Sequence, residues 1–148
     1  MKNEIYEYLI NYGFSKENLD RFEELNEDMY FVSLDKVKEN INFFEGKGLN
    51  NKEIISLANI NPFILTLSSK RKNTFDEIYI NKLNLSSDQI KYLLNNNSNI
   101  YTCSPLEFDK IINYLNYDKN YSIDNIKQII LNNPNIINKK IDEIAGII

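Results

Sequence analysis

Apolar and polar positions follow one pattern that occurs four times along the chain. Each copy begins with an apolar residue, has Ser or Asn at the next position (+1), and has further apolar residues at +5 and +8. Asn stands at +12 in every copy, and two apolar or aromatic residues follow at +15 and +16. The copies begin 35 or 36 residues apart, at Phe14, Leu49, Leu85 and Tyr121. Agreement at so many positions predicts a structural repeat.

The residue at +1 predicts the start of a helix in each copy. A Ser or Asn side chain before a helix accepts a hydrogen bond from a first-turn amide that otherwise has no partner. These residues are Ser15, Asn50, Ser86 and Ser122. Asn50 with Glu53, and Ser86 with Gln89, also resemble capping boxes. The apolar residues at +5 and +8 are three apart, so they lie on one face of the predicted helix.

The asparagine at +12 predicts the end of this helix, because Asn tolerates the left-handed conformation found at helix ends. Pro62 and Pro134 then prevent simple continuation of two of these helices. A short apolar turn follows, and a second serine begins a longer amphipathic helix. The second cap residues are Ser33, Ser68 and Ser104. Gly13 and Gly48 end the longer helix in the first two copies.

Neither helix of a copy can bury its apolar face alone, so successive copies must stack. We therefore predict an all-α fold, a helical-repeat solenoid of about four repeats with a C-terminal capping helix, in a single domain over residues 1–148. In the cap, Ile141, Ile144 and Ile148 would cover the open end of the stack. The predicted repeats are approximately 1–33, 34–68, 69–104 and 105–138, and the cap is 139–148.

These copies resemble the repeats of the mitochondrial transcription termination factor (mTERF) family. The shared pattern is apolar-Ser/Asn-x-x-Glu/Gln-Ile-x-x-Leu followed by Asn-Pro-x-Ile-Ile/Leu. It is best matched at 48–65 and 121–137, and in weaker form over nearly the whole chain. Two copies depart from it, with Glu27 and Ser98 in place of proline. The resemblance implies a left-handed superhelix of triangular three-helix repeats that binds nucleic acid with a positive inner surface.

Composition fits a globular protein, with 43% apolar and 26% charged residues. No apolar run approaches the roughly 20 residues needed to span a membrane, and the first residues lack the apolar core of a signal peptide. A lone cysteine, Cys103, agrees with a reducing compartment. We therefore expect a soluble, cytoplasmic protein with no membrane contact, and a buried, inert thiol at Cys103.

The charge balance argues against simple binding to duplex DNA. The formal net charge is -4, whereas a nucleic-acid-binding domain is normally basic. Residues 1–33 hold three basic and eight acidic residues, so the acidic excess lies almost wholly in the first repeat. An anionic patch there consists of Glu23, Glu24, Glu27 and Asp28. It is either a solvated polar end of the stack or a docking surface for a basic protein partner.

One basic run, Lys70-Arg71-Lys72, falls in the first turn of a predicted helix, where the helix dipole disfavours cations. A phosphate group or an acidic partner would explain the run, although solvated cations are a common alternative. The candidate nucleic-acid contacts are Lys36, Lys38, Lys70, Arg71, Lys72, Lys139 and Lys140.

Several kinds of chemistry are missing from the chain. The sequence has no histidine, one cysteine and only four glycines. This excludes Ser-His-Asp or Cys-His catalysis, His or thiolate metal sites, and the Gly-rich phosphate loop. Adjacent carboxylates on a helix point in different directions, so a carboxylate-based hydrolase is disfavoured. We expect no catalytic site, metal, cofactor or small-molecule substrate.

Two functional hypotheses follow. The first is a non-enzymatic regulatory protein that binds a protein partner, for example a phage-type inhibitor that occludes the basic groove of a nucleic-acid-targeting enzyme with its acidic end. The second is direct nucleic-acid binding, which the family resemblance implies. Clustering of the candidate cations on the inner surface would favour nucleic acid, and scatter would favour a protein partner.

Overall fold

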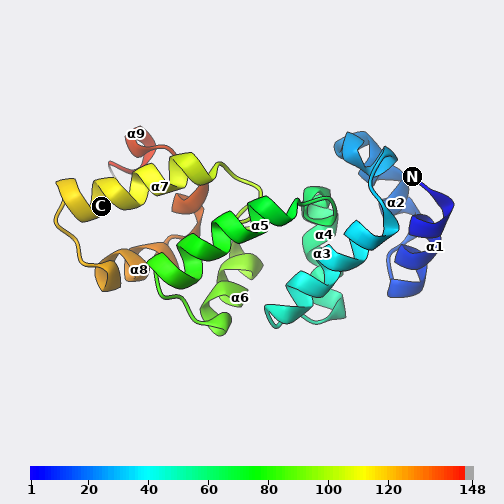
Figure 1. The fold of residues 1–148 in the computed structure, drawn as a ribbon, viewed down its shortest axis with the longest axis horizontal. Coiled ribbons are helices and arrows are strands. Elements are labelled where there is room, and N and C mark those ends of the chain that lie inside the picture. The colour runs from blue at the N-terminus through cyan, green and yellow to red at the C-terminus, as the bar shows by residue number, and fades with distance from the viewer. Residues whose placement is uncertain (146–148) are drawn as a thin grey trace. The chain divides into compact units, whose positions relative to one another are not determined.

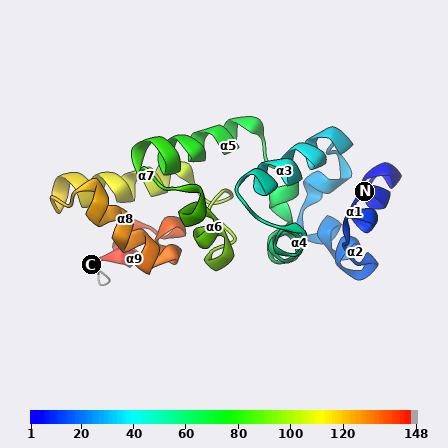
Figure 2. The same ribbon diagram turned by 90° about the horizontal axis from the view of Figure 1, so that it is seen from below.

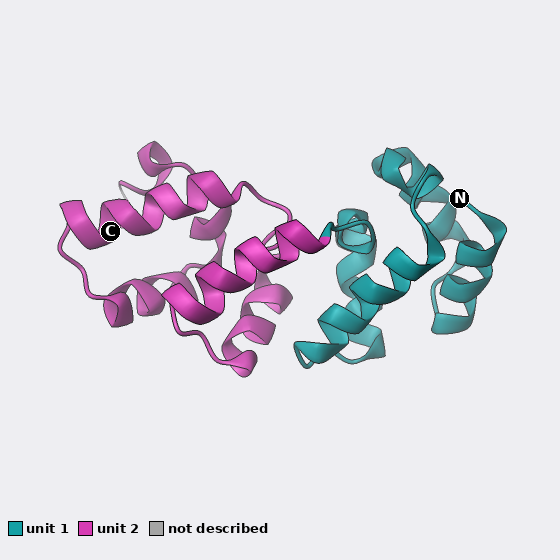
Figure 3. Ribbon diagram, viewed as in Figure 1, with its two compact units in different colours: residues 1–68 teal, residues 69–148 magenta. Residues whose placement is uncertain are grey.

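The computed structural model describes residues 1–145, and helices are the only regular elements among them (Figure 1). This confirms the all-α class. The chain divides into two compact units, residues 1–68 (unit 1) and 69–148 (unit 2), as Figure 3 shows. The division falls at a predicted repeat boundary, so each unit holds two repeats. No helix within residues 1–145 is both long and apolar enough to cross a membrane. The single domain stays a prediction.

Each repeat of unit 1 consists of two antiparallel α-helices and a short 3-10 helix. The third element replaces the apolar turn that the sequence predicts, and it gives the three-helix repeat that the family resemblance implies. The elements of the first repeat are α1 (Asn3–Tyr12), α2 (Lys16–Leu25) and η1 (Glu27–Tyr30). Those of the second are α3 (Leu34–Gly46), α4 (Asn51–Ile60) and η2 (Pro62–Leu65).

Unit 2 repeats this plan with longer first helices (Figure 2), and each of these helices ends in π-helical turns. The third repeat has α5 (Ser69–Asp76), the π-helix η3 (Glu77–Lys82), α6 (Ser87–Asn96) and a turn at 98–102. The fourth has α7 (Pro105–Asn113), the π-helix η4 (Tyr114–Asp118), α8 (Ile123–Asn132) and η5 (Pro134–Asn138). The cap helix α9 (Ile141–Ile144) follows.

All four predicted caps at +1 are confirmed. The side-chain oxygens of Ser15, Asn50, Ser86 and Ser122 accept hydrogen bonds from amides three residues on, at 2.9 to 3.2 Å. Both capping boxes are present, since the side chains of Glu53 and Gln89 accept from the cap amides in return. Ser33 and Ser104 cap α3 and α7 in the same way, and Ser68 directly precedes α5.

The core of each unit forms from the recurrent apolar positions. The residues at +15, which are Met29, Ile64, Ile100 and Ile136, are all at most 1% exposed. The residues at +5 and +8 are buried too, apart from the half-buried Ile129. Each large side chain that is removed from water in this way stabilises the fold by roughly 1.5–3 kcal/mol. The recurrent pattern therefore marks the buried face of each repeat.

Unit 2 also contains a buried aromatic cluster, in which four rings from three segments pack at centroid separations of 5.4 to 5.9 Å. These are Phe75, Tyr79, Tyr101 and Phe108. The Tyr79 hydroxyl donates to the Ile100 carbonyl, and the Tyr101 hydroxyl donates to Asp76 Oδ1 at 2.7 Å. Burial raises the pKa of both tyrosines, so both remain protonated donors at neutral pH.

The asparagines at +12 do not adopt the left-handed conformation that the sequence analysis predicts. Their φ angles lie between -137° and -151°, which is extended backbone. The side chain explains their recurrence instead. In Asn26, Asn61 and Asn97, Oδ1 accepts from the amide two residues on, at 3.0 to 3.3 Å, and so begins the following turn. This is the local side-chain bond that favours Asn at turns.

Left-handed backbone occurs one residue before each copy begins. Gly13, Gly48, Asn84 and Asn120 have φ angles of 128°, 95°, 55° and 57°. All four stand just after the first helix of a repeat, where a left-handed residue lets the chain reverse. Gly adopts this conformation without a Cβ penalty, and Asn is the side chain that tolerates it best. The predicted helix ends at Gly13 and Gly48 are thereby confirmed.

The +12 side chain also joins successive repeats. In unit 1, Nδ2 of the buried Asn26 donates to the Pro62 carbonyl and to Thr66 Oγ1, at 3.3 and 3.0 Å. In unit 2, Nδ2 of the buried Asn97 donates to the Pro134 carbonyl and to Asn138 Oδ1, both at 2.9 Å. Each of these side chains thus holds the turn of the next repeat.

The C-terminal segment begins as predicted but is short. α9 has four residues, with Ile144 buried and Ile141 half-buried. Ile148, the third residue expected in the cap, lies outside the described residues.

The left-handed positions generate the first prediction. Replacing Asn84 with Val should lower the free energy of unfolding by about 1–2 kcal/mol, because a β-branched residue is strained at positive φ. Replacing Asn84 with Gly, the residue at this position in unit 1, should change it by less than about 0.5 kcal/mol. Urea denaturation followed by circular dichroism measures both. A Val variant as stable as the Gly variant would contradict the observed conformation.

The second prediction compares two asparagines at +12. Replacing Asn97 with Ala should cost about 2 kcal/mol, because its partners Pro134 and Asn138 lose a donor in a partly buried site. The side chain of Asn133 is exposed and donates to the Ile129 carbonyl of its own helix at 3.3 Å, so Asn133→Ala should cost well under 1 kcal/mol. Thermal and urea unfolding measure the difference. Equal losses would mean that recurrence at +12 does not reflect contact with the next repeat.

Candidate functional site

The basic run at the start of α5 is not one solvated patch. Lys70 is exposed, and Arg71 is half-buried. Nη1 of Arg71 donates to the Cys103 carbonyl at 2.7 Å. Lys72, which the sequence analysis counted among the candidate contacts, is only 7% exposed, so little of its side chain reaches solvent. Lys72 is therefore removed from the set of candidate ligand contacts.

The turn around Cys103 connects the start of α5 with the end of η5. Arg71 donates to the backbone of this turn, and Cys103 Sγ lies 3.7 Å from the Ile137 carbonyl. Lys139 and Lys140 follow directly after η5. Two contacts therefore connect the cations of α5 with those that precede α9. We call Lys70, Arg71, Lys139 and Lys140 the unit 2 basic group.

Within this group, Lys70 and Lys140 are exposed, and Lys139 is half-buried. The Lys140 amide donates to Glu143 Oε1 at 3.1 Å, so one carboxylate lies beside the group. Lys70 stands in the first turn of α5, where the helix dipole attracts anions. A bound phosphate would offset the repulsion between Lys70 and the dipole.

Cys103 has a structural environment rather than a reactive one. Its side chain is half-buried, which is less than the full burial expected from sequence. Burial raises the pKa of the thiol to about 11, although the nearby Arg71 acts in the opposite direction. The thiol is therefore protonated at neutral pH and is a poor nucleophile.

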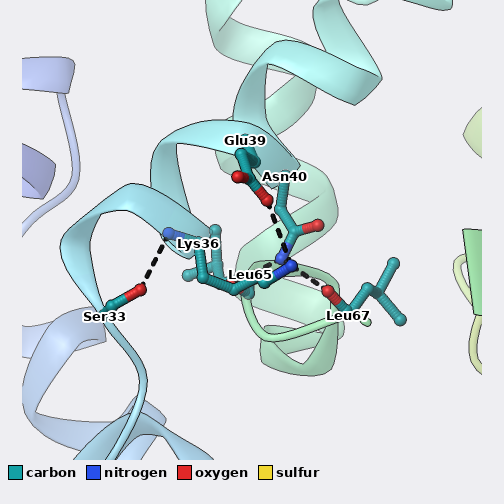
Figure 4. A network of polar contacts seen from close by, with 6 residues as sticks. All are labelled: Ser33, Lys36, Glu39, Asn40, Leu65 and Leu67. Atoms are coloured by element: carbon teal, nitrogen blue, oxygen red, sulfur yellow. Dashed lines mark hydrogen bonds and ion pairs between the residues drawn. The ribbon is translucent and has the colours of Figure 1, made fainter. Parts of the chain in front are cut away.

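The two candidate lysines of unit 1 have partners within that unit. Lys36 Nζ lies 3.1 Å from Glu39 Oε2, as Figure 4 shows, and Lys38 Nζ lies 5.3 Å from the centroid of the Tyr8 ring. In the same view Asn40, which is buried in α3, donates from Nδ2 to the carbonyls of Leu65 and Leu67 at 2.9 and 3.2 Å. These bonds hold α3, which carries both lysines, against the end of η2 and the segment that follows it.

Three of the four residues of the anionic patch face solvent. Glu24, Glu27 and Asp28 are exposed, whereas Glu23 is half-buried and forms an ion pair with the N-terminal ammonium group. Glu27 and Asp28 open the 3-10 helix η1, a position that favours carboxylates. The patch therefore contributes to local stability and still presents negative charge to solvent.

Charge divides between the two units. Unit 1 has seven basic and twelve acidic residues, and unit 2 has ten basic and nine acidic residues. Unit 2 is therefore the better match for a polyanion.

A shallow groove of about 520 Å³ lies between the first helices of the third and fourth repeats. It is lined by Thr74, Glu77, Ile78, Pro105, Leu106 and Asp109. Lys82 Nζ contacts Asp109 Oδ1, which neutralises one of the two carboxylates. No group of three or more His, Cys, Asp or Glu side chains that could hold a metal ion occurs within residues 1–145. The groove is mainly an apolar contact surface, and sequence reasoning did not find it.

Comparison with known protein families identifies the family of this chain. A search of curated protein sequences finds no similar protein. The family model of mTERF matches residues 1–145, which is nearly the whole chain. This match agrees with the repeated three-element plan of both units. The chain therefore belongs to the mTERF family.

Proposed function

We propose that this chain is a regulatory protein that binds nucleic acid and catalyses no reaction. The observation that supports this is the family match over residues 1–145, because membership in mTERF implies repeats that contact nucleic acid. Of the two hypotheses from sequence, family membership favours direct nucleic-acid binding over a protein partner or a phage-type inhibitor.

Unit 2 is the part of the chain best suited to contact phosphates. It has a small positive balance, and its basic group combines two exposed lysines with an arginine held by the Cys103 carbonyl. Lys70 adds its charge to the positive end of the α5 dipole. Together these features supply the sequence-independent attraction that dominates nucleic-acid affinity.

Unit 1 contributes less to this attraction. Its net charge is negative, Lys36 is paired with Glu39, and Lys38 lies over Tyr8. With so few available cations, we expect non-specific binding with a Kd in about the micromolar range at physiological salt.

The third prediction tests this proposal with two double variants. Lys70→Glu with Lys140→Glu should weaken binding to a fluorescein-labelled 20-base-pair DNA duplex by about tenfold at low salt. The log–log salt slope should fall by about 0.9 for each phosphate contact that is lost. Fluorescence anisotropy between 50 and 200 mM salt measures both quantities, and a single-stranded RNA of equal length tests the nucleic-acid type.

The matched control is Lys16→Glu with Lys52→Glu, which changes the net charge equally at two exposed lysines of unit 1. It should weaken binding by no more than about twofold. Equal weakening by both variants would show general repulsion and not a local interface in unit 2. If the unaltered chain binds neither nucleic acid at 50 mM salt, the proposed function is wrong.

A further inference from the structure

The two units differ in one set of exposed positions, which serves as an internal comparison. Position +11 lies at the end of the second helix of each repeat, +14 lies in the following turn, and +17 lies at the end of that turn or just after it. In unit 2 they are polar throughout: Asn96, Asn99, Thr102, Asn132, Asn135 and Asn138. In unit 1 they are Leu25, Asp28, Phe31, Ile60, Phe63 and Thr66. Four of the six positions in unit 1 are thus large apolar residues.

These apolar residues are exposed to water. Phe31 is 81% exposed, Ile60 73%, Leu25 50% and Phe63 46%. The corresponding residues of unit 2 are exposed or half-buried as well, so the fold presents these positions to solvent in both units. Because unit 2 forms the same turns with Asn and Thr, folding does not require apolar side chains here. Their presence in unit 1 calls for another cause, and contact with a partner is the usual one.

Hydrogen bonds place these residues on adjoining segments. Nη2 of Arg21 in α2 donates to the Asn59 carbonyl at 2.9 Å, next to Ile60 at the end of α4. Asn26, which follows Leu25, donates to the Pro62 carbonyl next to Phe63. The ends of α2 and α4 and the turns that follow them therefore lie side by side. Tyr30, which is half exposed, packs its ring edge-to-face on Phe31 at 6.4 Å.

We call these five residues, Leu25, Tyr30, Phe31, Ile60 and Phe63, the unit 1 turn surface. Most of its charged neighbours are acidic, since the exposed Glu24, Glu27 and Asp28 alternate with it along the first turn. The exception is Arg21, whose guanidinium group donates to the Asn59 carbonyl. Carboxylates beside aromatic rings repel phosphate groups, which disfavours nucleic acid as the occupant. They attract Lys and Arg, so the complementary surface is apolar and flanked by cations.

We propose that the unit 1 turn surface docks a protein partner through an apolar segment that is flanked by basic side chains. Phe31 and Phe63 would supply the buried aromatic contacts that dominate such interfaces. The three carboxylates would attract the basic side chains of the partner at long range and would favour basic partners over acidic ones. This inference does not depend on the proposed binding of nucleic acid by unit 2.

The fourth prediction uses defined peptides as probes of the whole chain. Three fluorescein-labelled 18-residue peptides would be titrated: an amphipathic Leu/Lys helix, a Leu/Glu helix with the same Leu positions, and a Lys/Ser peptide without apolar residues. The Leu/Lys peptide should bind, and the other two should bind at least tenfold more weakly. Fluorescence anisotropy gives the three dissociation constants.

The decisive variant gives unit 1 the residues of unit 2: Leu25→Asn, Phe31→Thr, Ile60→Asn and Phe63→Asn. It should weaken binding of the Leu/Lys peptide at least tenfold while the helical circular dichroism is retained. Phe31→Thr alone, at the most exposed position, should weaken binding at least threefold if the fourfold variant does not fold. The control replaces Ile80, Tyr92 and Tyr117, three exposed apolar residues of unit 2 outside the groove, with Asn, and it should bind as the unaltered chain does.

Several results would overturn the proposal. One is absence of Leu/Lys binding, and another is equal binding of the Leu/Glu or Lys/Ser peptide. Equal weakening by the control variant would show that any exposed apolar residue suffices. Self-association that the fourfold variant abolishes would identify a second copy as the occupant. Binding of a labelled single-stranded oligonucleotide that the same variant abolishes would identify nucleic acid.

Discussion

The side chain of the asparagine at +12 is the contact on which the arrangement of repeats depends. In Asn26 and Asn97 the extended backbone ends the second helix, Oδ1 starts the turn that follows, and Nδ2 reaches the turn of the next repeat. A residue that does all three must be short, must accept one bond and must donate two, which describes Asn, because Ser and Thr have one donor, Asp has none and Gln is longer. Because Asn26 and Asn97 are buried, each unmet bond would carry the cost of an unsatisfied polar group.

Local chemistry made much of the fold predictable. Each cap depends on a side chain and an amide three residues away, so Ser15, Asn50, Ser86 and Ser122 could be identified without the structure. The recurrent asparagine was found for the same reason but was given the wrong backbone conformation. The recurrence of Asn at +12 shows that the position matters, but it does not show whether the backbone conformation or a side-chain hydrogen bond requires Asn there. The left-handed residues were visible in the repeat, where Asn84 and Asn120 align with Gly13 and Gly48.

The candidate sites were less predictable, because exposure depends on packing between segments far apart in sequence. The neighbouring sequence does not distinguish Lys72, which is buried, from Lys70, which is exposed. The anionic patch of unit 1 was found as a run of charge, but the apolar side chains beside it became meaningful only once both units could be compared position by position. That comparison assigns the units different surfaces: a basic group in unit 2, and an acidic and aromatic surface in unit 1. A regulatory protein that joins a nucleic acid to a protein partner would use both.

A double-mutant cycle between Asn26 and Thr66 tests most directly whether the +12 side chain holds successive repeats together. The four proteins are the unaltered chain, Asn26→Ala, Thr66→Val and the double variant, each unfolded in urea. The Asn26 amide donates to Thr66 across the two repeats of unit 1, so we expect a coupling energy of about 0.5–1.5 kcal/mol. Losses that add to within about 0.3 kcal/mol would mean that the two side chains do not stabilise each other, and would contradict this role for the asparagine.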